Sequence, residues 1–454
     1  MVRIKMNNTT YLDTQNQRES NARSYPRRIP IAIDKAEGIY VTDVEGNTYY
    51  DCLAGAGTLA LGHNHPVVIE AIEEIVHNKR PLHTLDITTP MKEEFVSEIF
   101  DSLPEEFAKR AKIQFCGPTG SDAIEAALKL VKTATGRGGM LSFQGGYHGM
   151  TNGALSMMGN IGPKQQVPNL MPDVQFMPYP YSYRCPFGLG GDLGSKVSST
   201  YIERAITNPE GGIVKPAGMV MEMVQGEGGA VPAPIEWVQE MRRITKEQDI
   251  PLILDEVQTG IGRTGKMFAF EHAGITPDVL VLSKAIGGTL PLSVVIHDEK
   301  LDKWGPGAHS GTFRGNQMAI AAGTATIRYV KENNLEEHAE NMGAQLMNRL
   351  KQTQAETSSI GDVRGRGLMI GVEVVNMQQE ADTLGSYPEH PDLAKQIQKE
   401  CFNRGLILEL GGRFGSVIRF LPPLIITEEQ VNEISNIFHE AVRAAEQSLT
   451  AQMA

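Results

Sequence analysis

In the middle of the chain, an aspartate and a lysine each follow a short apolar run. Asp255 directly follows the run 251–254, and Lys284 follows the run 279–282 with only Ser283 between them. The amine of a lysine can form a covalent Schiff base with a carbonyl group. A carboxylate can hold a ring nitrogen in its protonated form, because an opposite charge stabilises the cation. The pair therefore indicates carbonyl chemistry on a ring that contains nitrogen.

Two further segments carry groups that suit the same chemistry. A Gly/Ser turn with Gly120 and Ser121 follows the apolar run 112–116 and opens a helical pattern, and Tyr147 and His148 follow another such run in GGYHG. Backbone N–H groups at a helix N-terminus bind phosphate, and an aromatic side chain can stack on a ring. Each feature alone has an ordinary explanation, such as a helix cap or a structural histidine. Together with the lysine and the acid they predict a site for pyridoxal 5'-phosphate (PLP).

The pattern around these residues predicts how they are brought together. From about 62 to 330, short apolar runs alternate with helical stretches, which is typical of an α/β fold with a mostly parallel sheet covered on both faces. In such sheets, ligands bind outside the carboxyl ends of the strands. We expect a hairpin at 38–52 and three parts: an N-terminal segment with the hairpin (1–61), a large PLP-binding domain (62–335) and a smaller α+β domain (336–454), which the N-terminal part joins.

Composition excludes several other classes of function. The chain has 454 residues and a formal net charge of −12, which argues against a nucleic-acid or anionic-membrane surface. Its four cysteines lack metal-type spacing, and the H-x-H of His63 and His65 has no further ligands nearby, so we expect no metal site. We find no membrane-length apolar run and no signal peptide, which predicts a cytoplasmic protein. The polar first 20 residues are expected to be loosely ordered.

The chain resembles the class III (ω-amino-group) PLP aminotransferases of fold type I. The resemblance extends from GHNHP near residue 62 to RFLPPL near 419, and the string from LILDEVQTGIGR to VLSKAIGG is specific to that family. It implies that Lys284 carries the cofactor as a Schiff base and that Asp255 partners the pyridine nitrogen. It also implies cofactor contacts for six other residues: Gly120 and Ser121 at the phosphate, Tyr147 and Val257 on the ring faces, His148 beside Tyr147, and Gln258 at the ring 3-hydroxyl.

The resemblance also implies that two subunits share each active site and that a glutamate can neutralise the arginine that binds the substrate. Thr312 in SGTFRGN matches a residue that reaches the phosphate of the other subunit, which implies a homodimer and leaves a tetramer open. Arg419 matches the arginine that grips an α-carboxylate, and Glu227 matches the glutamate that neutralises it when an ω-amine is bound. Arg314 is a candidate for a substrate carboxylate, with a structural ion pair at the dimer interface as the equal alternative.

Several strings narrow the expected substrate. GPTGSDAIEAALKLVK, LHTLDITTP and RCPFGLGG are most similar to the branch that moves the 4-amino group of L-2,4-diaminobutanoate to 2-oxoglutarate, giving L-aspartate 4-semialdehyde and L-glutamate. Met150 stands where some 4-aminobutyrate aminotransferases have an arginine for the substrate, which counts against that donor. Ornithine, acetylornithine and 4-aminobutyrate aminotransferases, a glutamate-semialdehyde aminomutase and a non-catalytic PLP-binding regulator remain as alternatives.

Overall fold

The larger part of the molecule is built on a seven-stranded sheet. The computed structural model describes residues 7–453. The strand order is β4-β12-β11-β10-β7-β5-β6, and only β12 runs antiparallel to its neighbours. The strands are β4 (Ala111–Phe115), β5 (Met140–Phe143), β6 (Val174–Met177), β7 (Gly218–Met221), β10 (Leu252–Asp255), β11 (Val279–Leu282) and β12 (Val294–Asp298). The expected α/β fold with a mostly parallel sheet is confirmed.

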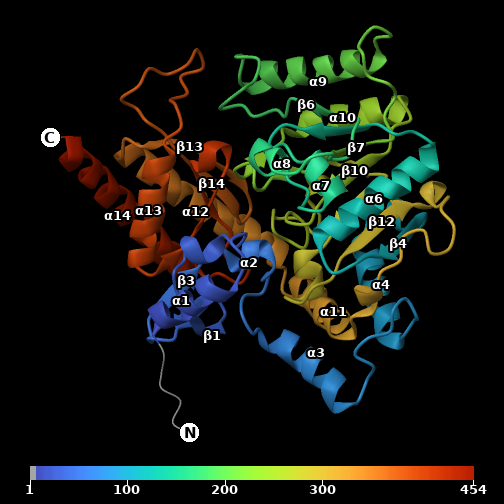
Figure 1. The fold of residues 1–454 in the computed structure, drawn as a ribbon, viewed down its shortest axis with the longest axis horizontal. Helices are drawn as coiled ribbons and strands as arrows, with labels where there is room; N and C mark the ends of the chain where they lie inside the picture. The colour runs from blue at the N-terminus through green and yellow to red at the C-terminus, as the bar shows by residue number, and fades with distance from the viewer. Residues whose placement is uncertain (1–6, 454) are drawn as a thin grey trace.

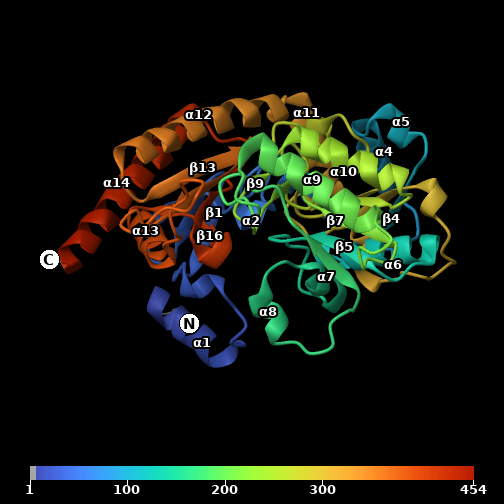
Figure 2. The ribbon, with the colours of Figure 1, turned by 90° about the horizontal axis from the view of Figure 1, so that it is seen from above.

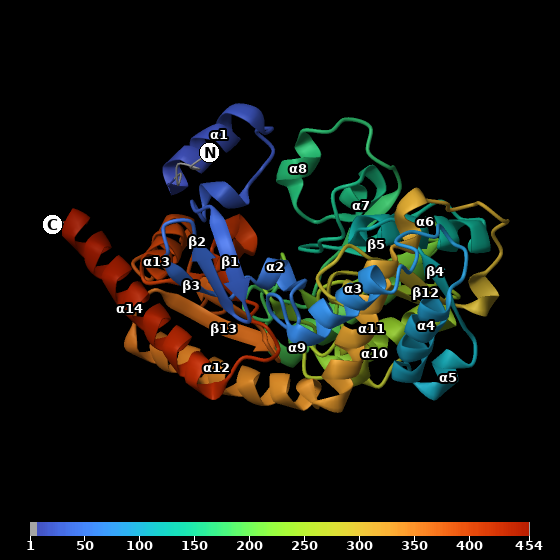
Figure 3. The same cartoon turned by 90° about the horizontal axis from the view of Figure 1, so that it is seen from below.

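Apolar residues on both faces of each strand hold this sheet between two layers of helices. In β10, Leu252 and Leu254 pack on one face with Trp237 of α10 (Ile235–Glu247), while Ile253 packs on the other with Leu128 of α6 (Gly120–Thr135). Successive side chains of a strand point to opposite faces, so a continuous apolar run buries both. The views in Figures 2 and 3 show α10 and α6 on opposite sides of the strands.

Two strands of this sheet were not expected from the sequence. β6 forms the edge beside β5, and β12 lies between β4 and β11. β6 contains the polar Gln175 and only its Met177 is buried, so it lacks the continuous apolar run of the expected strands, and β12 is joined to β11 by residues 283–293, which include a 3-10 turn. The reversed direction of β12 suits a connection that contains no α-helix, because parallel strands are usually joined by a crossover helix.

The two ends of the chain meet in the smaller part of the molecule. One sheet has the order β1-β2-β3-β15, in which the C-terminal β15 runs parallel to β3, and a second has the order β13-β14-β17-β16. Figure 1 shows the first strands beside the C-terminal helices. These strands are β1 (Ile33–Glu37), β2 (Tyr40–Asp43), β3 (Thr48–Asp51), β13 (Ile360–Arg366), β14 (Met369–Val374), β15 (Leu406–Ile407), β16 (Glu409–Gly411) and β17 (Val417–Phe420). The hairpin expected at 38–52 is β2 and β3.

Helices and one small hairpin complete the fold. The small part carries α12 (Leu335–Glu356), α13 (Pro391–Asn403) and α14 (Glu428–Met453). The remaining elements are α2 (Ala54–Gly57), α3 (Pro66–His77), α4 (Pro90–Ser102), α5 (Glu105–Ala108), α7 (Asn152–Met157), α8 (Ile161–Gln165), β8 (Val224–Gln225), β9 (Val231–Pro232), α9 (Gly191–Thr207) and α11 (Gln317–Glu332). Within residues 7–453, no helix is long and apolar enough to cross a bilayer.

The N-terminal segment is more ordered than the sequence suggested. Asn8–Arg18 form helix α1, whose first turn is capped by the side chain of Asn7 on the N–H of Thr10. Asn8 also donates a hydrogen bond from its side chain to Asp43 of β2 at 2.9 Å. The expected loose order is therefore wrong from Asn7 onward, and Met1–Met6 lie outside the described residues. Polar caps hold this helix, which lacks the apolar periodicity that predicts helices from sequence.

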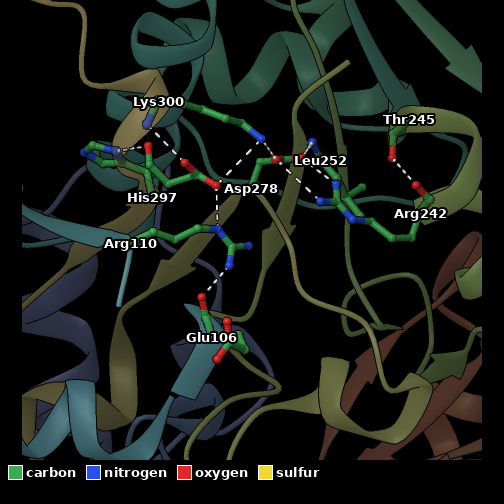
Figure 4. A network of polar contacts seen from close by, with 9 residues as sticks. Glu106, Arg110, Arg242, Thr245, Leu252, Asp278, His297 and Lys300 are labelled. Atoms are coloured by element: carbon green, nitrogen blue, oxygen red, sulfur yellow. Dashed lines mark hydrogen bonds and ion pairs between the residues drawn. The ribbon is translucent and has the colours of Figure 1, made fainter. Parts of the chain in front are cut away.

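A network of ion pairs lies at the amino ends of the parallel strands, at the edge of the sheet opposite their carboxyl ends. Asp278, directly before β11, lies 2.5 Å from Arg242 Nη1 and 2.6 Å from Lys300 Nζ, and it accepts the N–H of Leu252. Figure 4 shows these side chains converging on the Asp278 carboxylate. Because Asp278 accepts the N–H of Leu252, the network anchors the start of β10.

Candidate active site

A pocket opens at the carboxyl edge of the parallel strands. It is lined by residues that follow β4, β5, β7, β10 and β11, together with the loop after β8. These residues are Gly120, Ser121, Tyr147, His148, Gly149, Glu222, Glu227, Asp255, Val257, Gln258, Thr259 and Lys284. The pocket thus brings together nine of the twelve site residues expected from the sequence. The other three, Thr312, Arg314 and Arg419, lie outside its lining.

Lys284 lies inside the pocket at the start of a 3-10 turn. Its backbone has a φ of +52°, a left-handed conformation that a residue other than glycine rarely adopts. Burial lowers the pKa of its amine from the usual value, and the negative charge of Glu227 opposes this effect. A lower pKa leaves more of the amine neutral, and only the neutral amine is a nucleophile.

Asp255 is held in place by two hydrogen-bond partners. Its Oδ1 accepts the N–H of Val257 at 3.1 Å, and its Oδ2 lies 2.8 Å from Nδ1 of His148. Burial alone would lower the pKa of His148, but the hydrogen bond and charge of Asp255 raise it above its ordinary value. A protonated His148 fixes the orientation of the Asp255 carboxylate through a charge-assisted hydrogen bond.

Glu222 is a site residue that our sequence analysis missed. It directly follows β7, and its two carboxylate oxygens accept the N–H groups of Tyr147 and Gly226, each at 2.9 Å. It therefore joins the loop that carries Tyr147 to the loop that carries Glu227. Burial raises the pKa of Glu222 to about 7, with His148 opposing and Asp255 adding to the shift. The position after β7 was available as a signal, because the residues after four other strands had already been singled out.

The N-terminus of α6 provides an anion-binding site on one side of the pocket. Thr119 and Asp122 form a capping box, in which Thr119 Oγ1 accepts the N–H of Asp122 at 3.3 Å. The N–H groups of Gly120 and Ser121 have no partner within the helix, as is general for a first turn. A Cβ at position 120 would lie 3.0 Å from Cγ1 of Val257, so glycine allows α6 to begin close against Val257.

Arg419 is a buried cation behind the pocket. It lies on β17, is only 1% exposed, and its Nη2 is 2.6 Å from Oε1 of Glu227. The same nitrogen is 2.7 Å from Oε2 of Glu409, a residue of β16 that the sequence analysis did not single out. Burial would lower the pKa of Arg419, but the charges of the two glutamates raise it. The expected Arg419–Glu227 contact is therefore present, with a second carboxylate beside it.

Thr312 and Arg314 lie in a 3-10 turn away from the pocket of their own chain. Thr312 is exposed. Arg314 is 2.5 Å from Oδ2 of Asp86 and donates to the carbonyl of His309. Within one chain Arg314 thus forms a structural ion pair. Any contact of either residue with a second subunit stays a prediction.

Comparisons with known proteins identify the family. A sequence model of the aminotransferase class-III family matches residues 21–442. The chain belongs to the class III aminotransferases. It is 56% identical to a diaminobutyrate–2-oxoglutarate aminotransferase of Rhizobium meliloti (strain 1021), over 95% of this chain and 92% of the relative. It is 51% identical to a protein of the same name from Haemophilus influenzae, over 97% and 96%.

A solved structure supports the same conclusion for the fold. The PLP-bound amine transaminase from an uncultivated Pseudomonas species is 26% identical, with a TM-score of 0.82 over 94% of this chain and 97% of that one. The fold-type-I architecture expected for a class III aminotransferase is thereby confirmed.

The pocket of this class III aminotransferase fits PLP, the cofactor of the family. Two buried polar atoms of pocket-lining residues, Oε1 of Gln258 and Nε2 of His148, have no hydrogen-bond partner among the described residues. The other amide atom of Gln258 is fixed, because its Nε2 donates to the carbonyl of Ala56 at 2.8 Å. With the free N–H groups of α6 and the amine of Lys284, the pocket supplies donors for a phosphate, a polar contact for a ring hydroxyl and a nucleophile for an aldehyde.

Proposed function

We propose that this enzyme transfers the 4-amino group of L-2,4-diaminobutanoate to 2-oxoglutarate, giving L-aspartate 4-semialdehyde and L-glutamate. The observation that carries the proposal is the 56% identity to a relative of that name over 95% of the chain. The site supports it, because a cation that can be neutralised suits an enzyme with two unlike substrates. At the reacting carbon, glutamate carries a carboxylate, whereas diaminobutanoate carries none.

We assign the site residues the following roles. When bound, PLP supplies an electron sink for the pair released as a substrate C–H bond breaks. Asp255, oriented by His148, holds a proton at the ring nitrogen. Lys284 binds the cofactor at rest and, once displaced by the substrate amine, moves the proton off the reacting carbon. Gly120 and Ser121 bind the phosphate through their N–H groups.

Three side chains complete the cofactor contacts in this proposal. Tyr147 and Val257 would enclose the two ring faces, and the free amide oxygen of Gln258 would accept a hydrogen bond from the ring hydroxyl. Tyr147 is held by its N–H bond to Glu222, and Val257 by its N–H bond to Asp255. These backbone contacts keep the two walls of the pocket at a fixed separation, which excludes water from the ring faces.

The Arg419–Glu227 pair selects between the two substrates. While the ion pair is formed, Glu227 neutralises Arg419, and the site accepts a substrate whose reacting carbon has no carboxylate. With glutamate bound, Glu227 moves aside, and the guanidinium binds the α-carboxylate through a charge-assisted contact. Glu227 can move because its side chain is 37% exposed, whereas Arg419 is fixed in the core.

We further propose a cytoplasmic homodimer with shared active sites. The four cysteines are unpaired, which suits a reducing compartment. Large apolar side chains are exposed beside Thr312, among them Leu82, Ile87 and Phe313. Such a patch suits a subunit interface, and in the dimer Thr312 would approach the phosphate of the partner's site.

The first experiment is donor profiling of the purified enzyme by absorbance. We expect a band of lysine-bound cofactor that L-2,4-diaminobutanoate converts to the amine form of the cofactor, and that Lys284→Ala lacks. A control in which Lys300, a lysine of the distant ion-pair network, is changed to alanine should keep the band. If ornithine or 4-aminobutanoate converts the band and diaminobutanoate does not, the enzyme is another class III aminotransferase and the proposed substrate is wrong.

A further inference from the structure

Arg419 is paired with one more carboxylate than its charge requires. Its Nη2 lies within 2.7 Å of oxygens from both Glu227 and Glu409. Glu409 and Arg419 are direct cross-strand partners on β16 and β17, so this contact is built into the sheet. The second oxygen of Glu409 accepts a hydrogen bond from the hydroxyl of Tyr25 at 3.0 Å. The group thus combines a strand pair, the pocket loop and the N-terminal segment.

The charges and hydrogen bonds of this group are incomplete without a ligand. One carboxylate neutralises one guanidinium, so two leave a net negative charge around Arg419, which is costly at a buried position. Burial accordingly raises the pKa of Glu409, and Arg419 opposes that shift. At the same time, Nε and Nη1 of Arg419 are buried and have no hydrogen-bond partner within residues 7–453. A ligand that offers both a positive charge and an acceptor would satisfy both deficits.

The end group of an α-amino acid has these two properties on one carbon. In diaminobutanoate, the reacting 4-amine lies at one end, and the α-ammonium and α-carboxylate lie together at the other. Glu409 is close enough to the reacting centre for its charge to affect the amine of Lys284, as Glu227 and Arg419 also do. The group around Arg419 therefore lies within the electrostatic reach of a substrate bound beside Lys284.

We propose that Glu409 is a donor-specificity residue that accepts the α-ammonium of diaminobutanoate, with Tyr25 as the residue that positions its carboxylate. The inference rests on the proposed function, since it assumes an amine donor with an α-amino-acid end group. Glu227 neutralises Arg419 for every donor that lacks a carboxylate at the reacting carbon. Glu409, in contrast, discriminates among these donors by requiring a second ammonium. The residue thereby favours diaminobutanoate over 4-aminobutanoate, which differs only in lacking that group.

The test compares single half-reactions of the holoenzyme by rapid-mixing absorbance. Glu409→Gln keeps the shape of the side chain and removes its charge. We expect the apparent dissociation constant for L-2,4-diaminobutanoate to rise at least about tenfold, as for loss of a charged hydrogen bond. The constants for L-glutamate and for 4-aminobutanoate, followed as a reactant or as a competitor, should change less than about threefold.

A second pair of variants guards against a folding effect. Tyr25→Phe removes only a hydroxyl from a partly exposed side chain and should weaken diaminobutanoate binding in the same selective way, to a smaller extent. Tyr40→Phe is the matched control, because among the described residues the Tyr40 hydroxyl forms a hydrogen bond only with the half-buried Gln430, away from Arg419. The control should leave all three constants unchanged, and all variants should keep the cofactor band and the melting temperature.

Three outcomes would overturn the inference in distinguishable ways. Equal losses for glutamate and diaminobutanoate would mean that Glu409 acts only by holding Arg419. Unchanged constants in Glu409→Gln would mean that the α-ammonium binds elsewhere, with the proposed function intact. A wild-type enzyme that reacts with glutamate and not with diaminobutanoate would overturn the proposed function, and this inference with it.

Discussion

Glycine at position 120 is a residue whose absent side chain decides the geometry of the site. An added Cβ would lie 3.0 Å and 3.1 Å from the two methyl groups of Val257. Contacts this short force one neighbour to move by a few tenths of an ångström. The residues that would move are the first turn of α6, which is assigned to the phosphate, and Val257, which is assigned to the ring.

We predict that Gly120→Ala weakens cofactor binding about tenfold without unfolding the protein, because misplaced N–H groups lose part of a charge-assisted contact. The measurement is a titration of apoenzyme with PLP followed by absorbance. Gly138→Ala is the matched control, since a Cβ there meets nothing within 4 Å. Equal cofactor affinity in both variants would contradict the assignment of the α6 N-terminus to the phosphate.

Glu227 acts at the same scale through its charge. We predict that Glu227→Gln lowers kcat/KM for the diaminobutanoate half-reaction about tenfold or more, because Arg419 is left less neutralised when an ω-amine binds. The glutamate half-reaction should keep its rate within about threefold, since the guanidinium is open for the α-carboxylate. 4-Aminobutanoate should be affected together with diaminobutanoate, unlike in the Glu409 variant. A loss confined to glutamate would reverse the roles that we assign.

At the scale of elements, the strands carry the catalytic groups at one edge and the structural charges at the other. β10 begins where Asp278 binds the N–H of Leu252, and it ends at Asp255. β11 begins directly after Asp278 and ends at Leu282, two residues before Lys284. The network can therefore be altered without touching the pocket. Arg242 lowers the pKa of Asp278 although burial opposes this, and the lowered pKa makes the network sensitive to acid.

We predict that Asp278→Asn lowers the free energy of unfolding by about 2–4 kcal/mol near neutral pH, because it leaves Arg242 without its buried partner. Asp278 has a lower pKa in the folded than in the unfolded protein. Its contribution is therefore present above the unfolded pKa and disappears as the pH falls through the folded pKa. Urea unfolding at several pH values should show the wild-type advantage shrinking in acid.

The matched control for this prediction is Asp249→Asn. Asp249 also pairs with an arginine, Arg137, but its side chain is largely exposed, so its loss should cost little. Steady-state kinetics of Asp278→Asn at temperatures where it is folded should equal those of wild type. A large change in the kinetics would show that the network acts on the pocket as well as on stability.

At the scale of the whole molecule, one surface has the character of a subunit interface. The segments around His83 and Phe313 are joined by the hydrogen bond from the N–H of Thr84 to the carbonyl of Gly315, and their rings lie 5.7 Å apart. Phe313 is 67% exposed and is adjacent to Thr312. Burying this surface in a homodimer would bring Thr312 to a second subunit.

We predict that Phe313→Asp shifts the enzyme from dimer to monomer and lowers cofactor affinity, because a charge at an apolar interface core is costly and Thr312 leaves the partner's site. Sedimentation velocity gives the mass, and PLP titration gives the affinity. Val214→Asp, at an 88% exposed position, is the control and should change neither. A dimeric Phe313→Asp variant with normal affinity would place the interface elsewhere.

Local sequence determined five of the seven strands of the large sheet and the chemical groups that follow them. Asp255 and Lys284 were predictable because a continuous apolar run specifies a buried strand and the next residue must lie at its carboxyl edge. Glu222 follows the same rule after β7 and could have been found. The family and its PLP chemistry were also accessible from sequence, since the string around Lys284 is long and specific.

Only the tertiary structure decided which distant groups meet. His148 reaches Asp255 across 107 positions, and Tyr25 reaches Glu409 across 384 positions. No local pattern encodes such contacts, because they depend on the order of strands in the sheet and on the return of the N-terminal segment to the C-terminal strands. Sequence therefore determined the reaction type, through residues tied to strand ends. That Glu409 lies beside Arg419 could be seen only from the pairing of β16 with β17, because the register of two strands, and not position along the chain, decides which residues are cross-strand neighbours.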